Sequence, residues 1–193
     1  GRPMRTLTVG DRHLKHRYVL PRIDGLLIER PEITRVVFLG DHCDEWGARE
    51  ADELSALEFF ADWARERQRE GFELDILIGN HDMRYIRGKR GPGTMTTAMR
   101  PIRKILEDDI DIIGMACAVG PCLCTHAGVA GIWARRYLPE HPDAKRDAES
   151  VARELNGMLA DSANWEALDS CPPSRGGWSL PGPLWADLRD LAA

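Results

Sequence analysis

Three short apolar stretches each end at a glycine and are followed at once by acidic, amide or imidazole side chains. The stretches are TLTVG at 6–10, ITRVVFLGD at 33–41 and ELDILIGNHD at 73–82. Short runs rich in β-branched residues and bounded by glycine are typical of β-strands. Acidic side chains at the end of a buried strand cost free energy unless an arginine, a helix N-terminus or a metal compensates them. The repeat therefore predicts three strands whose ends share a chemical role.

The segments between these strands have helical periodicity. Segment 48–71 carries apolar side chains at spacings of three to four, at Leu54, Leu57, Phe60 or Ala61, and Ala64. It stops at Gly71, which predicts an amphipathic helix with a glycine cap. The segment after His13 is also predicted to be helical, although Pro21 should limit its length.

Strand, helix, strand, helix, strand in this order predicts parallel strands with helices packed on the sheet, which is an α/β fold. In such sheets the loops at the carboxyl ends of the strands converge on one edge, where ligands usually bind. We therefore expect the three polar strand ends to meet in space.

The rest of the chain gives weaker signals. Segment 96–109 predicts a loop and a helix, and segments 116–120 and 122–128 predict two strands joined by a glycine-proline turn. Segment 144–169 is rich in Ala, Glu, Arg and Leu and predicts one long helix. Segment 171–183 is rich in Pro, Gly and Ser and predicts a loop.

The composition excludes several classes of protein. The chain has 193 residues, 43% of them hydrophobic, so we expect one domain over 4–193, with residues 1–3 as a remnant of cloning. A net charge of −5 without a long basic run argues against general nucleic-acid binding. No stretch is apolar over the length that spans a membrane. Five irregularly spaced cysteines indicate a reducing compartment, so we expect a cytoplasmic protein.

The polar residues at the predicted strand ends form a candidate metal site. They are Asp11, His13, Asp41, Asp44, Asn80, His81, Asp82 and His126. Carboxylates, a carboxamide and imidazoles are oxygen and nitrogen donors that suit Mn, Fe, Zn or Mg. A lone Asp after Gly is more often a helix cap or a turn residue, so the metal hypothesis depends on these residues acting together.

Four motifs in this order resemble those of the calcineurin-like metallophosphoesterases. They are GDRH at 10–13, GDHCD at 40–44, GNHD at 79–82 and THAG at 125–128. PLWAD at 183–187 is similar to a segment of the phosphoprotein phosphatase branch, which includes bacterial dinucleoside tetraphosphate hydrolases. The resemblance covers most of the chain and implies a β-sandwich of mixed sheets flanked by helices, in α/β/β/α layers. It also implies hydrolysis of phosphoester or phosphoanhydride bonds.

The same resemblance implies two divalent metal ions. Manganese is the expected metal, and iron, zinc, nickel or magnesium are the alternatives. By family position, Asp11, His13 and Asp41 would bind one ion, and Asp41, Asn80 and His126 the other. A hydroxide bridging the two ions would be the nucleophile, because metal coordination lowers the pKa of bound water.

The resemblance also assigns roles around the bond that breaks. His81 would protonate the leaving oxygen, and Asp82 or Asp44 would hold its ring and raise its pKa. Arg84 and Arg87 follow in the next loop and could bind phosphate. The substrate would be a phosphorylated small molecule, a nucleotide or a phosphoprotein.

Two departures from the family leave alternatives open. Glu45 stands where phosphoprotein phosphatases have an arginine, and no histidine follows His141, where the family has a further ligand segment. Either the sequence stops before that segment, another group completes the coordination, or the second ion binds weakly. The alternatives are a dinucleoside polyphosphate hydrolase and a binding module without catalysis. Trp46 beside the predicted site could stack on a base or an aromatic leaving group. The oligomeric state stays open.

Overall fold

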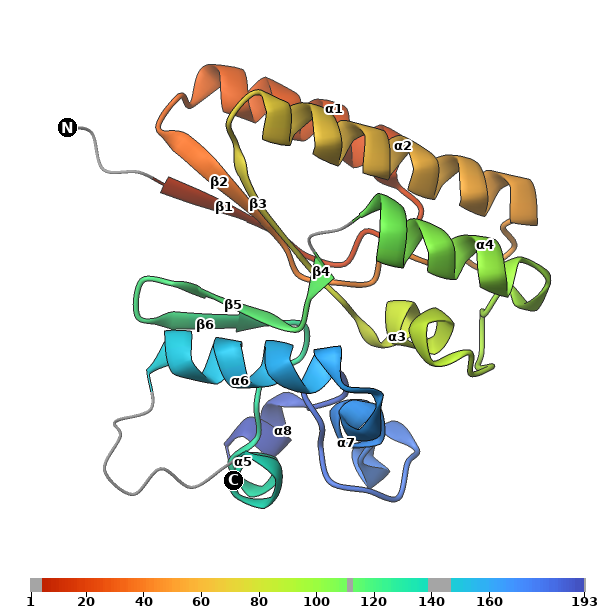
Figure 1. Ribbon diagram of the computed structural model, residues 1–193, viewed down its shortest axis with the longest axis vertical. Coiled ribbons are helices and arrows are strands. Elements are labelled where there is room, and N and C mark those ends of the chain that lie inside the picture. The colour runs from red at the N-terminus through yellow and green to blue at the C-terminus, as the bar shows by residue number, and fades with distance from the viewer. Residues whose placement is uncertain (1–4, 111–112, 139–146, 193) are drawn as a thin grey trace. The chain divides into compact units, whose positions relative to one another are not determined.

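A computed structural model describes residues 5–110, 113–138 and 147–192. The chain divides into two compact units, Gly1–Ile113 and Gly114–Ala193, and each is considered by itself (Figure 1). That the chain forms one domain stays a prediction. The expected cloning remnant and His141 lie outside the described residues.

The first unit alternates strands and helices. Its elements are β1 (Arg5–Val9), α1 (His16–Glu29), β2 (Ile33–Phe38), α2 (Glu50–Arg69), β3 (Glu73–Leu77), α3 (Asn80–Arg87) and α4 (Met99–Lys104). A short 3₁₀ turn, Thr96–Ala98, precedes α4, and a π-helical turn, Ile105–Asp109, follows it. The two-residue strand β4 (Ile113–Gly114) lies at the junction of the units.

The sheet of the first unit has the strand order β1-β2-β3-β4, and β2 pairs in parallel with both β1 and β3. The strands and helices expected at 6–10, 33–41, 48–71 and 73–82 are present, so the α/β prediction with parallel strands is confirmed. Helix α1 runs through Pro21 to Glu29 and is therefore longer than we expected.

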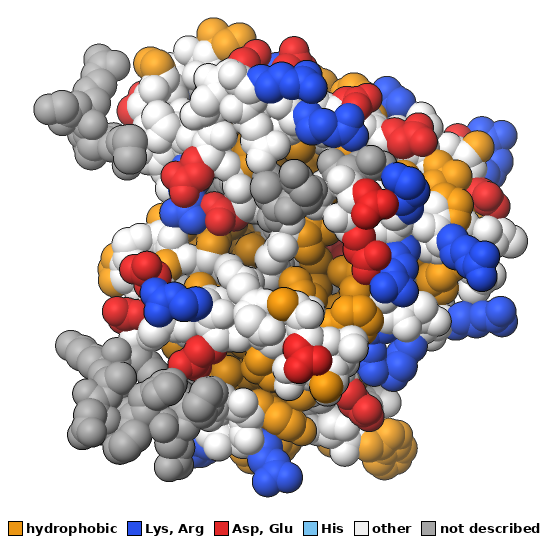
Figure 2. All heavy atoms as spheres, viewed as in Figure 1, with side chains coloured by type: hydrophobic (Ala, Val, Ile, Leu, Met, Phe, Trp, Pro, Cys, Tyr) orange, Lys and Arg blue, Asp and Glu red, His pale blue; other side chains and the backbone are white. Residues whose placement is uncertain are grey.

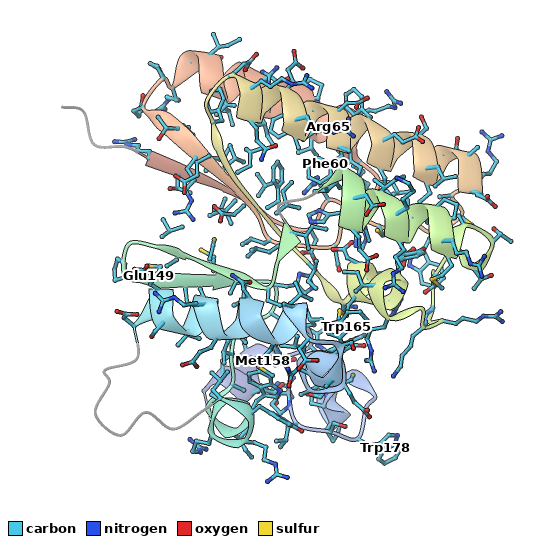
Figure 3. The ribbon with its side chains drawn as sticks, in the orientation of Figure 1. Phe60, Arg65, Glu149, Met158, Trp165 and Trp178 are labelled. Carbon is cyan, nitrogen blue, oxygen red and sulfur yellow. The ribbon has the colours of Figure 1, made fainter. Side chains whose placement is uncertain are left out.

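Helices α1 and α2 lie side by side along the sheet (Figure 1). Phe60 of α2 is fully buried, and its ring contacts Phe38 at the end of β2 with 5.2 Å between centroids. Arg65 lies on the outer side of the same helix (Figure 3). The apolar stripe of α2 therefore covers β2, the strand whose Val36, Val37 and Phe38 have no exposed surface.

The second unit is a hairpin covered by helices. Its elements after β4 are β5 (Ala116–Val119), β6 (Cys122–Thr125), α5 (Gly131–Tyr137), α6 (Ala148–Ala160), α7 (Trp165–Leu168) and α8 (Leu188–Leu191), with 3₁₀ turns at Ser162–Asn164 and Pro173–Arg175. Strands β5 and β6 pair antiparallel, as the sequence predicted. Helix α6 packs on the hairpin, where the Asn156 side-chain oxygen accepts the backbone N–H groups of Met115 and Ala116.

The prediction of one long helix over 144–169 is wrong for the residues of this range that the structure describes, 147–169. Helix α6 stops at Ala160, because Asp161 leaves the helical backbone and its side chain accepts the N–H of Ala163 to start a 3₁₀ turn. Aspartate competes for backbone N–H groups in this way and often ends a helix.

Within the described ranges, no helix is long and apolar enough to cross a membrane. Acidic and basic side chains are mixed over α2 and α4 on the face shown in Figure 2.

Candidate functional site

The loops that follow β1, β2 and β3 meet at the carboxyl end of the parallel sheet in the first unit. The backbone N–H of His13 donates to the Asp41 carbonyl oxygen at 2.9 Å. The N–H of His81 donates to the Asp41 carboxylate at 3.0 Å, and the N–H of His42 donates to the Asp82 carboxylate at 2.8 Å. The three polar strand ends therefore come together, as parallel topology requires.

Three residues of these loops have a left-handed backbone. Their φ angles are 47° at His13, 52° at Asp41 and 66° at Asp44. Residues other than glycine rarely adopt this region, and each instance costs on the order of 1–3 kcal/mol. Such residues gather at functional sites, where the surrounding structure holds them. The three lie in the loops that the sequence singled out.

Asp82 joins the loops that follow β2 and β3. Its side chain is fully buried and accepts the N–H groups of Gly79 at 2.8 Å, His42 at 2.8 Å and Cys43 at 3.0 Å. Burial, together with the negative charge of Asp41, raises the pKa of Asp82 to about 6. Asp82 thus holds backbone N–H groups in place. None of its described hydrogen bonds involves the His81 ring.

Asp41 lies where α3 approaches the end of β2. It is buried, and one oxygen of its carboxylate lies within 4.8 Å of one in the exposed Asp11 carboxylate. Gly79 lies directly against it, since a Cβ atom on Gly79 would be 2.0 Å from Asp41 Oδ1 and 2.4 Å from its backbone N. Only glycine fits at this point.

His81 and Asp44 form a hydrogen-bonded pair. The distance between His81 Nδ1 and Asp44 Oδ2 is 2.6 Å, and Asp44 is almost completely buried. Burial alone would lower the pKa of His81, but the hydrogen bond to Asp44 and the charge of Asp41 outweigh it and raise this pKa. The imidazole is therefore kept protonated over a wider pH range, with Nδ1 donating to Asp44 and Nε2 available as a second donor.

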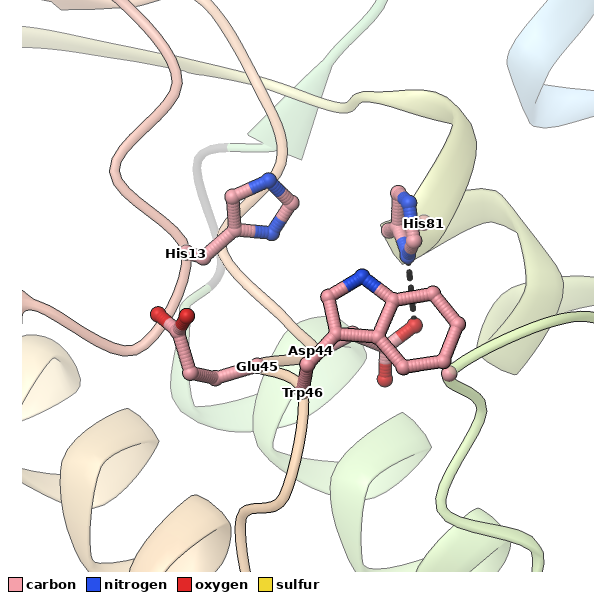
Figure 4. A pocket seen from close by; sticks show the side chains of 6 residues that line it. His13, Asp44, Glu45, Trp46 and His81 are labelled. Atoms are coloured by element: carbon pink, nitrogen blue, oxygen red, sulfur yellow. Dashed lines mark hydrogen bonds and ion pairs between the residues drawn. The ribbon is translucent and has the colours of Figure 1, made fainter.

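A cavity of about 90 Å³ opens beside this pair. His13, Asp44, Glu45, Trp46, His81 and Gly93 line it (Figure 4). The His13 and His81 rings meet edge to face with centroids 5.2 Å apart. His13 Nδ1 donates to the Cys43 carbonyl oxygen at 2.9 Å. The cavity thus combines two imidazole rings and an exposed indole.

Arg84 lies in α3 one turn beyond His81. Its guanidinium donates to the Pro92 carbonyl oxygen at 2.5 Å and lies 3.9 Å from the Asp44 carboxylate. A cation this close can attract an anionic group that enters the cavity. Arg87 is half-buried at the end of α3.

The structure brings most of the predicted site residues into the first unit. They are Asp11, His13, Asp41, Asp44, Asn80, His81, Asp82, Arg84 and Arg87. His126 follows β6 in the second unit. The catalytic and substrate-binding roles given to these residues stay predictions.

Cys43 belongs to the same loop and is unsuited to act as a nucleophile. Its side chain has no exposed surface. Burial and the surrounding carboxylates, Asp82 first among them, raise its pKa well above the usual value. Because the thiolate is the reactive form, Cys43 is an inert thiol.

The fold resembles those of cold-active protein tyrosine phosphatases. One such structure matches with a TM-score of 0.57 and 16% sequence identity, over 95% of this chain and 55% of that chain. Another, from a psychrophilic Shewanella species, matches with a TM-score of 0.55 and 17% identity, over 98% of this chain and 61% of that chain. The chain thus spans less than two thirds of their length, and at this identity the likeness shows a shared fold. No protein-family profile and no curated protein matches the chain.

This comparison corrects the family assignment. The matching structures are protein tyrosine phosphatases, which overturns the assignment to the calcineurin-like metallophosphoesterases. The metallophosphoesterase β-sandwich and the two divalent metal ions, manganese included, rested on that assignment and are withdrawn with it. The acidic strand ends have another physical reason in this structure, since Asp41 and Asp82 accept backbone N–H groups from neighbouring loops.

Two buried residues behind the pair, Glu53 of α2 and Tyr85 of α3, were not predicted from the sequence. The Tyr85 hydroxyl contacts the Asp44 carboxylate, and Glu53 accepts the Asp44 backbone N–H at 3.0 Å. One signal could have found Glu53, because it continues the apolar stripe of Leu57, Phe60 and Ala64 toward the N-terminus of the helix. A carboxylate on a buried stripe requires a partner.

Proposed function

We propose that this chain is a hydrolase of phosphoesters in which His81 protonates the leaving oxygen. The observation that carries the proposal is the 2.6 Å contact between His81 and the buried Asp44 at the edge of a cavity. As the bond from phosphorus to the leaving oxygen breaks and a bond to the attacking water forms, the Nε2 proton of His81 passes to the leaving oxygen. The proton that the water loses goes to solvent, and His81 Nε2 takes a proton back from solvent before the next turnover. Asp44 stabilises the imidazolium and orients the ring.

Two further observations support a phosphoryl group in this cavity. Its volume of about 90 Å³ is well below the roughly 300–1,000 Å³ of sites that enclose a whole small molecule, so it suits one group of a larger substrate. Arg84 supplies a positive charge close to the pair. The structures of similar fold are phosphatases, which agrees with this chemistry.

Replacing His81 tests the proposal through the leaving group. We expect His81→Gln to lower kcat for phenyl phosphate about 100-fold, because the phenolate leaving group needs a proton. The loss for p-nitrophenyl phosphate should be clearly smaller, since p-nitrophenolate leaves readily without one. Steady-state kinetics at pH 6.5 with both esters measures the two losses.

Equal losses with the two esters would contradict proton donation by His81. A thermal unfolding curve close to that of the unchanged protein is the control that His81→Gln remains folded. Absence of activity toward both esters in the unchanged protein would overturn the proposed function itself.

We further propose that the preferred substrates are aryl phosphates such as phosphotyrosine. Trp46 is 80% exposed, and its indole ring extends over the cavity that His81 lines (Figure 4). A second, wider hollow of about 450 Å³ shares Glu45 and Trp46 with the first. An aromatic leaving group in that hollow would stack on the indole.

Trp46 should therefore matter for aromatic substrates alone. We expect Trp46→Ala to raise KM for phenyl phosphate by up to about tenfold, which corresponds to one aromatic pair, and to leave KM for glycerol phosphate unchanged. Trp178→Ala is a matched control, because Trp178 is 97% exposed in the second unit (Figure 3). Equal changes in KM for both substrates would contradict stacking.

A further inference from the structure

Asp44 is held by two side chains from different helices, Glu53 of α2 and Tyr85 of α3. Its backbone N–H donates to Glu53 Oε1 at 3.0 Å, and its carboxylate accepts the Tyr85 hydroxyl proton. The Tyr85 oxygen in turn accepts the Met95 backbone N–H at 2.7 Å. Since Asp44 has a left-handed backbone with φ of 66°, these contacts hold it in a conformation that it would otherwise rarely adopt.

Glu53 is placed where a negative charge is unfavourable. Its side chain has no exposed surface, and Oε2 is buried without a hydrogen-bond partner among the described residues. The groups that face it are Asp44 and Cys43 from the loop after β2 and Tyr85 from α3, and none of these supplies a positive charge. The single Tyr85 proton lies mainly on the hydrogen bond to Asp44, and the longer contact of the hydroxyl with Glu53 Oε1, at 3.3 Å, leaves Oε2 without a donor.

The titration of Glu53 agrees with this geometry. Burial, together with the charge of Asp44, raises the pKa of Glu53 to about 7. The group therefore carries a proton at mildly acidic pH and loses it near neutrality, next to the carboxylate that orients His81.

We propose that Glu53 is a positioning residue that holds Asp44 for His81 while it is protonated, and that its ionisation destabilises this arrangement. The inference rests on the proposed function, because it assigns Glu53 a place behind the proton donor. In its neutral form Glu53 accepts the Asp44 N–H and repels no neighbour. As an anion, it would stand beside the Asp44 carboxylate with a buried oxygen that lacks a donor.

Stability gives a test that needs no activity. A carboxyl group whose pKa is higher in the folded than in the unfolded state stabilises the fold at low pH, and this contribution is lost as pH rises through about 7. Between pH 5 and pH 8, Glu53 should therefore raise the unfolding equilibrium constant by roughly 50-fold. We expect Glu53→Gln to remove this part of the pH dependence and to leave the part due to Asp82 and His81, whose pKa values are also raised. Urea unfolding at pH 5, 6, 7 and 8 measures it.

Glu50→Gln is the matched control for stability, because Glu50 lies in the first turn of the same helix and is exposed. Its unfolding constant should follow that of the unchanged protein at every pH. The same pH dependence in Glu53→Gln and in the unchanged protein would overturn the inference about protonation.

Kinetics tests the positioning role. At pH 6, Glu53→Met removes the acceptor for the Asp44 N–H and should lower kcat for phenyl phosphate about tenfold with little change in KM. Glu53→Gln keeps the acceptor oxygen and should retain kcat within about twofold. Full kcat in a folded Glu53→Met variant, or equal loss in both variants, would overturn the positioning role. If the unchanged protein hydrolyses no phosphoester, the proposed function fails, while the unfolding experiment still decides whether Glu53 is protonated.

Discussion

Gly79→Ala should both destabilise the protein and remove its activity. A Cβ atom on Gly79 would lie 2.0 Å from Asp41 Oδ1 and 2.4 Å from the Asp41 backbone N. Rotation of the Asp41 side chain could relieve the first clash but not the second, because the second involves the backbone. We expect a loss of about 3 kcal/mol in the free energy of unfolding, at the upper end for overpacking. Because Asp41 also accepts the His81 N–H, its displacement should move His81 and reduce kcat about 100-fold. Urea unfolding and phenyl phosphate hydrolysis measure the two effects.

Gly10→Ala is the control for this prediction. Gly10 ends the first predicted strand and precedes Asp11, just as Gly79 ends the third and precedes Asn80. A Cβ atom on Gly10 would meet nothing within 4 Å, so the change in stability should stay within about 0.5 kcal/mol. If both variants behaved alike, the close approach of Gly79 to Asp41 would not be what requires glycine.

The strands and helices of the first unit could be predicted well because each of them depends on the spacing of residues that are close together in the sequence. The β-branched run at 33–41 and the helical spacing of 48–71 each depend on neighbouring residues, and β2 and α2 lie within these ranges. The single helix expected over 144–169 failed for the opposite reason. Composition favoured a helix there, but one side chain, Asp161, bonds to the backbone and ends it.

The meeting of the strand ends was predictable, whereas the partner of each side chain was not. Either Asp44 or Asp82 could have held His81 from sequence alone, and only the fold shows that Asp44 contacts the ring while Asp82 accepts backbone N–H groups. The motif order also suggested a family that the comparison with solved structures overturned. Spacing along the chain does not reveal which acidic residues serve as acceptors for the backbone.

The apolar stripe of α2 could have singled out Glu53, but the contacts that Glu53 and Tyr85 make with Asp44 could not be predicted from the sequence. Tyr85 reaches Asp44 across 41 positions, and Glu53 lies nine positions from Asp44 at the far end of a loop. Neither belongs to a motif. Their role depends on α2 and α3 packing around one loop, which is a property of the folded unit.

Phe38→Ala should be the most damaging change in the core of the first unit. Phe38 ends the central strand β2, has no exposed surface, and contacts the Phe60 and Trp63 rings edge to face. The Arg12 guanidinium also lies over this ring, 4.2 Å from its centroid. We expect a loss of about 4–5 kcal/mol in the free energy of unfolding, measured by urea denaturation at pH 7.

The Arg12 guanidinium explains why this loss should reach the upper end of the range. It is buried between the Phe38 and Phe60 rings, and burial lowers its pKa to about 9 despite the opposing charge of Asp82. Both terminal nitrogens lack a hydrogen-bond partner among the described residues, so the rings are their main contacts. Removing one ring leaves a cavity beside a buried cation.

Phe59→Ala is the comparison that isolates this effect. Phe59 precedes Phe60 in α2 but is half-buried. The guanidinium of the exposed Arg17 lies over its ring, 4.5 Å from the centroid. Its removal should cost about 1 kcal/mol, because solvent replaces the lost contacts. A loss at Phe38 no larger than at Phe59 would mean that the stacking of Arg12 between two rings contributes little, and that α2 is held on the sheet by the other residues of its stripe.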